Sequence, residues 1–428
     1  MNRFGLLLTS FFFATLVHAL PPKPAEPQVS PLAITGVTIH VGNGDVIDDG
    51  IVTFKDGIIT GVYRHADAPG LEGYDIVRRD GEHLYPGFVL PNSSVGLAEI
   101  NSVRGSRDDR EAGLLNASVR SIVAYNTDSE LLPTFRFNGV LTAQIAPRGN
   151  LIAGNSSIVQ LDAWNWQDAA IKLDDAMHIS WPRLLKAKPD YLRRQVSYEP
   201  SDRYTSSVQQ LKDLFAEAST VGETDNLNIQ AVQQLLTGER QLFIHANGAR
   251  QLVDAIQFIR QFDVPRPVFV GAKEALKVKQ LLLDAEVPIL VDFVHGLPAT
   301  THGTVDDNYE RAALFKKAGF NIGLGANIRQ APSSDRNLPF IAGTVAAYGM
   351  DPEQALQLIT ESNAQILGIA DVLGTIEVGK HATFFTSAGD ALEMRTSRLT
   401  SCFIQGRTVE INGMQQELYD RFSEKYTD

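Results

Sequence analysis

The stretch Gln241–Ala272, QLFIHANGARQLVDAIQFIRQFDVPRPVFVGA, decides the fold class. It begins with a short apolar run, continues with Leu252, Ile256 and Ile259 at helical spacing, and ends in a second apolar run. The same unit, a short strand followed by a loop and a helix, recurs along the chain to about residue 365. Such repeats are typical of a parallel sheet covered by helices.

The repeating region is long enough to close into a barrel. It occupies residues 86–373, and a (β/α)8 TIM barrel needs roughly 250 residues. An open doubly wound sheet is the alternative, but no Gly-x-Gly-x-x-Gly turn follows a first strand. We therefore expect an α/β fold with a (β/α)8 barrel from residue 86 to residue 373.

Segments with strand patterns flank this region on both sides. Residues 34–85 contain apolar runs separated by Lys55-Asp56-Gly57, and Asp-Gly between such runs is typical of a hairpin. Residues 374–414 return to short strand patterns. We expect the two segments to pair as one small β-sandwich domain, followed by a charged C-terminal tail over residues 415–428.

The N-terminal residues have the pattern of an export signal. Arg3 precedes the apolar run Gly5–Val17, and Val17-His18-Ala19 offers the small or compact residues that a signal peptidase reads. We expect residues 1–19 to be a cleaved signal peptide and residues 20–33 to be a Pro-rich linker, which makes the mature protein periplasmic or secreted. No second apolar stretch approaches about 18 residues, so no membrane span is expected after cleavage.

The composition excludes several classes of protein. The 428 residues carry 38 Lys and Arg against 50 Asp and Glu, and an acidic chain of net charge −12 is a poor general binder of nucleic acid. The one cysteine, Cys402, cannot form an internal disulfide or a Cys-rich zinc site. The nine histidines would be enough for a His-based metal enzyme, so their positions decide the question.

Several motifs resemble those of the amidohydrolase superfamily, in the same order along the chain. They are Tyr85–Val89 (YPGFV), Asn363–Ile369 (NAQILGI), Gly374–Lys380 (GTIEVGK) and Phe403–Val409 (FIQGRTV). A second set is similar to the exported imidazolonepropionase-like branch of that superfamily. It comprises Asn126–Glu130 with Pro133, Ile152–Ser157, Leu161–Trp166 and Arg336–Pro339.

The resemblance implies hydrolysis of C–N bonds in amides and cyclic amides. In the family one or two divalent metals, commonly zinc, lower the pKa of a bound water and polarise the carbonyl group. The resemblance places the metal ligands at the C-terminal ends of the barrel strands. They are a His-x-His pair at strand 1, often a Lys or Glu at strand 4, single His residues at strands 5 and 6, and an Asp at strand 8.

This sequence departs from the ligand pattern at most positions. Asn92 and Ser94 stand where the His-x-His pair is expected, and strand 8 ends in Ala326-Asn327 in place of an Asp. Strand 6 has no histidine at its end, so His245 at strand 5 is the remaining ligand position that we can place. A catalytic zinc needs about three protein ligands. We therefore expect a degenerate metal site in which zinc is absent or weakly bound.

Four other residues are candidates for a site. His245 and Asp335 are candidate catalytic residues, Asp335 as an acid displaced from the end of strand 8. Arg336 is a candidate for binding a substrate carboxylate, with a role at the helix entry as the alternative. Trp164 is a candidate for lining a substrate pocket, with packing as the alternative.

Apart from His18, which belongs to the expected signal peptide, the remaining histidines divide into three sets. His295 and His302 could join His245 in a compensating site, or they could belong to a solvated polar loop. We expect His178 to be a surface or packing residue. Four more belong to the flanking β segments and are expected to lie far from the barrel mouth: His40, His65, His83 and His381.

Two functions follow from these observations. One is a C–N hydrolase whose activity has been lost or altered with its metal ligands. The other is a non-catalytic binding protein, or the partner subunit of an active paralogue with intact ligands. Either could bind a small-molecule substrate or ligand, and either could be a homo-oligomer or a hetero-oligomer.

Overall fold

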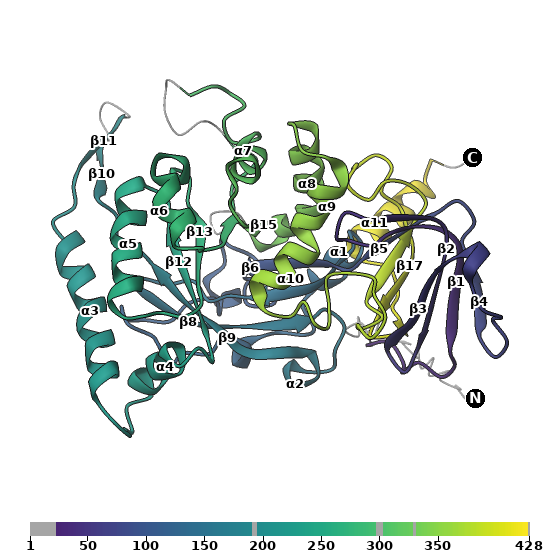
Figure 1. Ribbon diagram of the computed structural model, residues 1–428, viewed down its shortest axis with the longest axis horizontal. Helices are drawn as coiled ribbons and strands as arrows, with labels where there is room; N and C mark the ends of the chain where they lie inside the picture. The colour runs from purple at the N-terminus through teal and green to yellow at the C-terminus, as the bar shows by residue number, and fades with distance from the viewer. Residues whose placement is uncertain (1–22, 191–194, 297–302, 328–330, 427–428) are drawn as a thin grey trace, which may run out of the picture.

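The computed structural model describes residues 23–190, 195–296, 303–327 and 331–426. The expected signal peptide and the first residues of the linker lie outside the described residues, as does His302. The described chain forms a helix-covered barrel sheet and a second sheet built from both ends of the chain (Figure 1). No described helix is long and apolar enough to cross a membrane.

The first of these sheets is a nearly closed barrel of eight strands. In spatial order they are β6 (Phe88–Ser93), β7 (Val140–Ile145), β8 (Ile152–Gln160), β9 (Ala170–Ser180), β12 (Gln241–Ala246), β13 (Pro267–Gly271), β14 (Ile289–Val291) and β15 (Ile322–Leu324). The backbone N–H of Ala326 donates to the carbonyl of Pro91 across the gap between β15 and β6, at 3.1 Å. The side chain of Asn363 bridges the same gap by donating to the carbonyls of Val89 and Leu324, both at 2.8 Å.

The barrel departs from strict strand–helix alternation at one place. β8 runs antiparallel to both β7 and β9, whereas the other neighbouring strands are parallel. The loop of residues 146–151 between β7 and β8 is too short for a crossover helix, and a short connection can join only antiparallel strands. Consequently a tight hairpin loop lies at the mouth of the barrel, beside the C-terminal ends of the parallel strands.

Helices cover the parallel part of the barrel. They are α3 (Tyr204–Thr220), α4 (Leu227–Leu236), α5 (Ala249–Gln261), α6 (Lys279–Asp284), α7 (Arg311–Ala318), α8 (Leu338–Ala347), α9 (Pro352–Ile359) and α10 (Glu361–Leu367). Three shorter or peripheral helices are α1 (Leu132–Arg136), α2 (Trp166–Ala169) and α11 (Met414–Ser423). Leu252, Ile256 and Ile259 of α5 are buried as their spacing predicts.

The second sheet joins the two ends of the chain, as Figure 1 shows by the purple and yellow strands lying side by side. Its strands are β1 (Leu32–His40), β2 (Val46–Lys55), β3 (Ile58–Arg64), β4 (Asp75–Arg78), β5 (His83–Pro86), β16 (Phe384–Ser387), β17 (Leu399–Ile404) and β18 (Arg407–Thr408). β5 and β16 pair antiparallel, so the two terminal segments meet there. The strands form one continuous sheet, and the expected sandwich of two packed sheets is therefore not confirmed.

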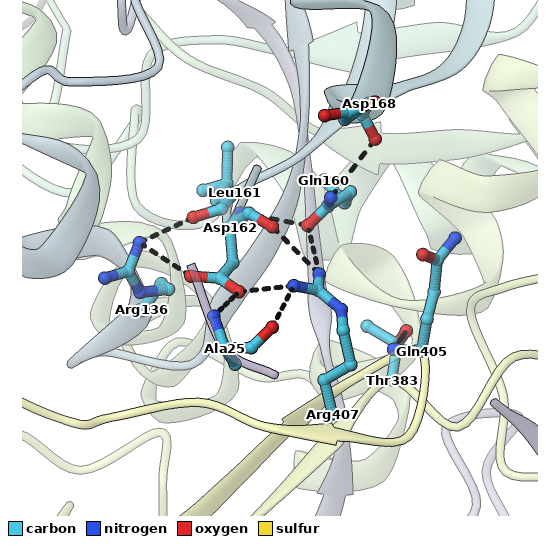
Figure 2. Close-up of polar contacts among 9 residues, drawn as sticks. All are labelled: Ala25, Arg136, Gln160, Leu161, Asp162, Asp168, Thr383, Gln405 and Arg407. Atoms are coloured by element: carbon cyan, nitrogen blue, oxygen red, sulfur yellow. Dashed lines mark hydrogen bonds and ion pairs between the residues drawn. The ribbon is translucent and has the colours of Figure 1, made fainter. Parts of the chain in front are cut away.

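A network of buried polar groups connects this sheet to the floor of the barrel (Figure 2). Asp162, just after β8, accepts a hydrogen bond from Arg407 of β18 at 2.7 Å and lies 4.0 Å from Arg136 of α1. The same carboxylate accepts from the backbone N–H of Ala25 at 3.0 Å, so it also holds the chain that precedes β1. Asp162 therefore fixes the barrel, the terminal sheet and the N-terminal chain to one another.

A two-stranded ribbon extends beyond the barrel at the end away from the terminal sheet (Figure 1). It consists of β10 (Leu185–Asp190) and β11 (Gln195–Pro200), which pair antiparallel. Successive side chains of a strand point to opposite faces, so the ribbon has two distinct faces.

Candidate functional site

The polar groups of the barrel mouth come from strand ends that are far apart in the sequence. Asn92 lies near the end of β6, and His178 and His245 lie near the ends of β9 and β12. Arg148 lies in the loop between β7 and β8. Asp335 belongs to a 3₁₀ turn, Pro332–Asn337, that follows β15. The structure thus brings the predicted residues His245 and Asp335 together at the mouth. Asn92, at the first position of the expected His-x-His pair, lies there as well.

Asn92 is fully occupied by contacts within the protein. Its side-chain oxygen accepts a hydrogen bond from Arg148 Nη1 at 3.2 Å, and its backbone carbonyl accepts one from Arg148 Nη2 at 2.9 Å. Its amide nitrogen Nδ2 donates to the carbonyl of Ala326 at 3.3 Å. The φ angle of Asn92 is 59°, a left-handed conformation that Asn adopts more readily than most residues. Asn92 thus holds the Arg148 guanidinium at the mouth.

Gln144 and Asp175 fix Asn92 from inside the barrel. The side-chain amide of Gln144 donates to Asp175 Oδ2 at 2.7 Å, which orients its carbonyl oxygen to accept the backbone N–H of Asn92 at 3.0 Å. Asp175 also accepts from the hydroxyl of Ser156 at 2.7 Å. Burial raises the pKa of Asp175 to about 6, although these two hydrogen bonds oppose the shift. The result is a buried chain of contacts from Asp175 to Arg148.

His178 and His245 form a hydrogen-bonded pair. His178 Nδ1 and His245 Nε2 are 3.1 Å apart, and one of the two nitrogens donates to the other. Burial lowers the pKa of His245 to about 3, and the positive charge of Arg148 contributes. Burial, His245 and Arg148 hold the pKa of His178 well below its ordinary value. Both imidazoles are therefore neutral at physiological pH.

Asp335 lies beside the end of β6. Its Oδ2 accepts a hydrogen bond from the hydroxyl of Ser93 at 2.7 Å, and the side chain is buried. Burial raises the pKa of Asp335 to about 7, against the opposing effects of Ser93 and Arg148. A carboxyl group with this pKa can accept or donate a proton near neutral pH.

Arg148 is the cation at the centre of this group. Burial lowers the pKa of its guanidinium, while the negative charges of Asp335, Asp109 and Asp292 oppose that shift. Arginine nevertheless remains charged in proteins. Within the part of the chain that the structure describes, no carboxylate lies within 4.0 Å of this guanidinium. Among the described residues, its side chain makes hydrogen bonds to the neutral Asn92.

Three cavities open around these residues. One of about 140 Å³ lies against Arg148, His178 and His245. A second, of about 240 Å³, shares His245 and Ser180 with the first and extends toward Asp292 and Asn327. A third, of about 330 Å³, continues from Asp292 and Asn327 past His295. The mouth can accordingly accommodate a small molecule.

Several predicted residues lie elsewhere. Ser94 is buried, and its carbonyl accepts the N–H groups of Leu97 and Ala98 in a turn. The side chain of Arg336 lines a cavity of about 390 Å³ beside α8 and α11, separate from the three at the mouth. Trp164 follows β8 at the floor of the barrel and is 62% exposed. The structure therefore does not bring Arg336 or Trp164 to the candidate site.

The histidines settle one alternative and leave another expectation untested. Of the surface and packing roles expected for His178, its 1% exposure excludes the surface role, and its ring packs against Phe243 and bonds to His245 at the barrel mouth. His295 lines the third cavity, and its Nε2 lies 2.8 Å from Thr344 Oγ1. His302 is outside the described residues, so a site that joins it to His245 and His295 is not tested. Arg148 was missed as well, because no motif marks a short hairpin loop as part of a site.

The side chains at the mouth do not fit a catalytic zinc ion. Among the described residues, no three His, Cys, Asp or Glu side chains come together as a possible metal site. Zinc in a catalytic site has about three protein ligands. Here the two imidazoles bond to each other, and Asn92 Oδ1 accepts from a cation.

Comparisons with known proteins agree with this architecture. The model of the amidohydrolase family matches residues 196–412. A solved amidohydrolase from Thermotoga maritima MSB8 is 21% identical, with a TM-score of 0.77, covering 89% of this chain and 99% of its own. A prolidase complexed with N-methylphosphonate-L-proline is 15% identical, with a TM-score of 0.56 and 89% and 100% coverage. A molinate hydrolase is 16% identical, with a TM-score of 0.54 and 90% and 96% coverage. At these identities the likeness shows the fold, and a comparison with curated proteins finds no match.

Proposed function

Because this chain belongs to the amidohydrolase family, we propose that it retains the barrel of a C–N bond hydrolase but has lost or altered the metal-dependent reaction. In this proposal the barrel mouth binds a small molecule without a catalytic zinc. The observation that carries it is the position of Arg148, whose guanidinium bonds to Asn92, the residue at the first expected ligand position.

Electrostatics supports this proposal. A divalent cation at the expected position would lie against a guanidinium in a site of low effective dielectric constant, where like charges repel strongly. The neighbouring carboxyl, Asp335, has a pKa of about 7, so near neutral pH it is partly protonated and supplies less than a full negative charge. The arrangement therefore favours the guanidinium of Arg148 over a metal ion at this position.

Two finer proposals rest on the sequence. We assign the chain to the exported imidazolonepropionase-like branch because of the second set of motifs, such as Ile152–Ser157 and Leu161–Trp166. We place the mature protein in the periplasm or outside the cell because of the N-terminal pattern. N-terminal sequencing of the exported protein should find a start close to residue 20, whereas a retained Met1 would contradict export by cleavage.

The experiment that tests the loss of zinc is metal analysis of the mature protein, purified without a chelator. We expect well below one zinc per chain by mass spectrometry. The double variant Asn92→His and Ser94→His should gain no zinc, because Arg148 remains and the ligands of strands 6 and 8 are still missing. A wild-type protein that tightly binds one or more zinc ions per chain would overturn the proposal.

A second function, as a subunit of an oligomer, is favoured by the β10–β11 ribbon. Alternation along the paired strands places six exposed apolar residues on one face: Leu185, Ala187, Pro189, Val196, Tyr198 and Pro200. On the other face Lys186 and Lys188 pair with Glu199. An isolated two-stranded ribbon is marginally stable in water, and contiguous exposed apolar residues mark interaction surfaces.

Tyr198→Ser tests the subunit function, with Lys188→Ser as a matched control on the opposite face. If the ribbon joins subunits, light scattering after size exclusion should show an oligomer for the wild type and the control. Tyr198→Ser should shift the mass toward one chain. A wild type that is monomeric alone, and also when co-expressed with a paralogue that has intact ligands, would contradict this function.

A further inference from the structure

The cavity of about 140 Å³ at the mouth has an unusual lining, and we refer to it as the Arg148 cavity. Its lining residues are Arg110, Pro147, Arg148, Gly149, Ala153, His178, Ser180 and His245. Two of these carry a positive charge and none carries a negative charge. The cavity is therefore electropositive at short range, although the whole chain is acidic.

The two arginines of the cavity differ in how their charges are satisfied. Arg110 lies 3.3 Å from the buried carboxylate of Asp109. Arg148 has hydrogen bonds to Asn92 but, in the described residues, no ion-pair partner. A guanidinium has five N–H donors, and two nitrogens each donate once to Asn92, which leaves about three donors free for a ligand. A desolvated cation without a counter-charge is costly, so an anion in the cavity would offset that cost.

The other polar groups of the cavity suit an anion as well. His178 and His245 are uncharged, and because one N–H is used between them, the pair has one ring N–H left to donate. When His245 Nε2 donates to His178 Nδ1, that N–H is on His178 Nε2, which has no hydrogen-bond partner among the described residues. The hydroxyl of Ser180 can also donate. A planar carboxylate matches the fork of a guanidinium and can accept two parallel hydrogen bonds from it.

The adjoining cavity of about 240 Å³ has space for the rest of such a ligand. It shares Ser180 and His245 with the Arg148 cavity, so the two spaces meet there. Its lining combines the charged residues Arg183, Lys273 and Asp292 with apolar surface from Val270 and Phe293, whereas Trp181 is 3% exposed and adds little. A ligand with a carboxylate at one end and an aromatic or aliphatic body at the other would be complementary to the pair of cavities.

We propose that the barrel mouth binds a small organic acid, with its carboxylate against Arg148 and its apolar body against Phe293. The inference rests on the proposed function, because the carboxylate would contact a protein cation in place of a metal ion. The ligand is then recognised by its negative charge, and a neutral amide of the same shape should bind poorly.

Binding of phenylacetate and of its neutral isostere phenylacetamide to the full mature chain tests this proposal. Both would be titrated into chelator-treated protein and followed by isothermal calorimetry or ligand-observed NMR. We expect phenylacetate to bind at least about tenfold more tightly than phenylacetamide, the ratio that about 1.4 kcal/mol provides. Arg148→Gln should remove most of that preference, whereas Arg250→Gln, at an exposed arginine of α5, should leave it unchanged.

The outcomes separate this inference from the proposed function. Equal affinity of the two probes, or an unchanged preference in a folded Arg148→Gln protein, would overturn the carboxylate site alone. If Arg148→Gln does not fold, Phe293→Ala and the two wild-type titrations decide, since Phe293→Ala should weaken both probes. Binding of phenylacetate that requires added zinc would overturn the proposed function, because the anion would then be bound by a metal.

Discussion

Buried arginines lie at both ends of the barrel, but their surroundings differ. At the floor, Arg407 and Arg136 share the carboxylate of Asp162, and the backbone of Ala25 completes the set (Figure 2). At the mouth, Arg148 is held by the neutral amide and carbonyl of Asn92. At the floor both arginines thus have a carboxylate within 4.0 Å, although their two positive charges exceed the one negative charge of Asp162. At the mouth, no carboxylate of the described residues lies within 4.0 Å of the Arg148 guanidinium.

The difference indicates what each cluster does. A buried ion pair whose hydrogen bonds are satisfied holds elements in place, and the floor cluster joins three segments of chain that are distant in the sequence. A half-buried cation without an ion-pair partner costs free energy and does not stabilise the fold by its charge. Its position beside a cavity suits the binding of an anionic ligand, as proposed above.

The largest effect is expected from breaking the floor cluster. Asp162→Asn should lower the free energy of unfolding by about 3–5 kcal/mol, because it leaves Arg407 and Arg136 without their carboxylate. Urea denaturation measures the change. The control is Asp168→Asn in α2, the short helix that follows, where the side chain is exposed and the change should stay within about 0.5 kcal/mol. A loss below about 1 kcal/mol for Asp162→Asn would contradict a structural role for the floor.

Asp335 is expected to give the mouth a pH-dependent stability. Its pKa is raised to about 7 in the folded protein from an ordinary value of 3.8, so the folded state binds the proton more tightly than the unfolded state. The resulting stability is present below pH 3.8 and is lost as the pH rises through 7. Asp175, whose pKa is raised to about 6, acts in the same direction.

Asp335→Asn should remove the contribution of that carboxyl. The free energy of unfolding of the wild type, relative to the variant, should fall by a few kcal/mol between about pH 4 and pH 8. Denaturation curves across this range measure the difference. A difference that rises with pH would show that the Asp335 pKa is lowered, and that the carboxylate is paired with Arg148 after all.

The smallest effect is expected from removing the cation of the mouth. Arg148→Gln loses two hydrogen bonds to Asn92 but no ion pair, so the loss of stability should be about 1–2 kcal/mol. The same replacement at the floor, Arg407→Gln, is the matched comparison and should cost clearly more, because it leaves Asp162 short of a partner. Equal losses of stability in Arg148→Gln and Arg407→Gln would contradict the difference that we describe between the floor and the mouth.

Much of the fold was accessible from the sequence because it depends on local patterns. The repeated strand and helix units predicted the barrel, and the flanking motifs predicted the family that residues 196–412 match. The antiparallel direction of β8 relative to β7 and β9 was not predicted, because the residue pattern of an apolar strand does not depend on the direction of the strand. The single terminal sheet was not predicted either, because a sandwich and one curved sheet share the same alternation.

The residues of the candidate site were also predicted only in part from the sequence. The motif spacing placed Asn92 and His245 at strand ends, and position after β15 made Asp335 a candidate. Arg148 and His178 carry no motif, and each acquires its role from contacts with residues 56 and 67 positions away. Arg336 and Trp164 had suitable chemistry, but Arg336 lines a cavity beside α11 and Trp164 lies at the floor of the barrel.

The sequence by itself determined the family and the repeated strand and helix units, and it predicts Asn92 and Ser94 at the expected ligand positions, because these depend on residue identity at fixed spacing. Only the tertiary structure decided what surrounds Asn92. Charge, burial and hydrogen-bond partners depend on which strand ends meet, and here the closing barrel sets a hairpin arginine against Asn92 and two neutral histidines. That meeting of distant segments turns an altered ligand pattern into a specific positive cavity.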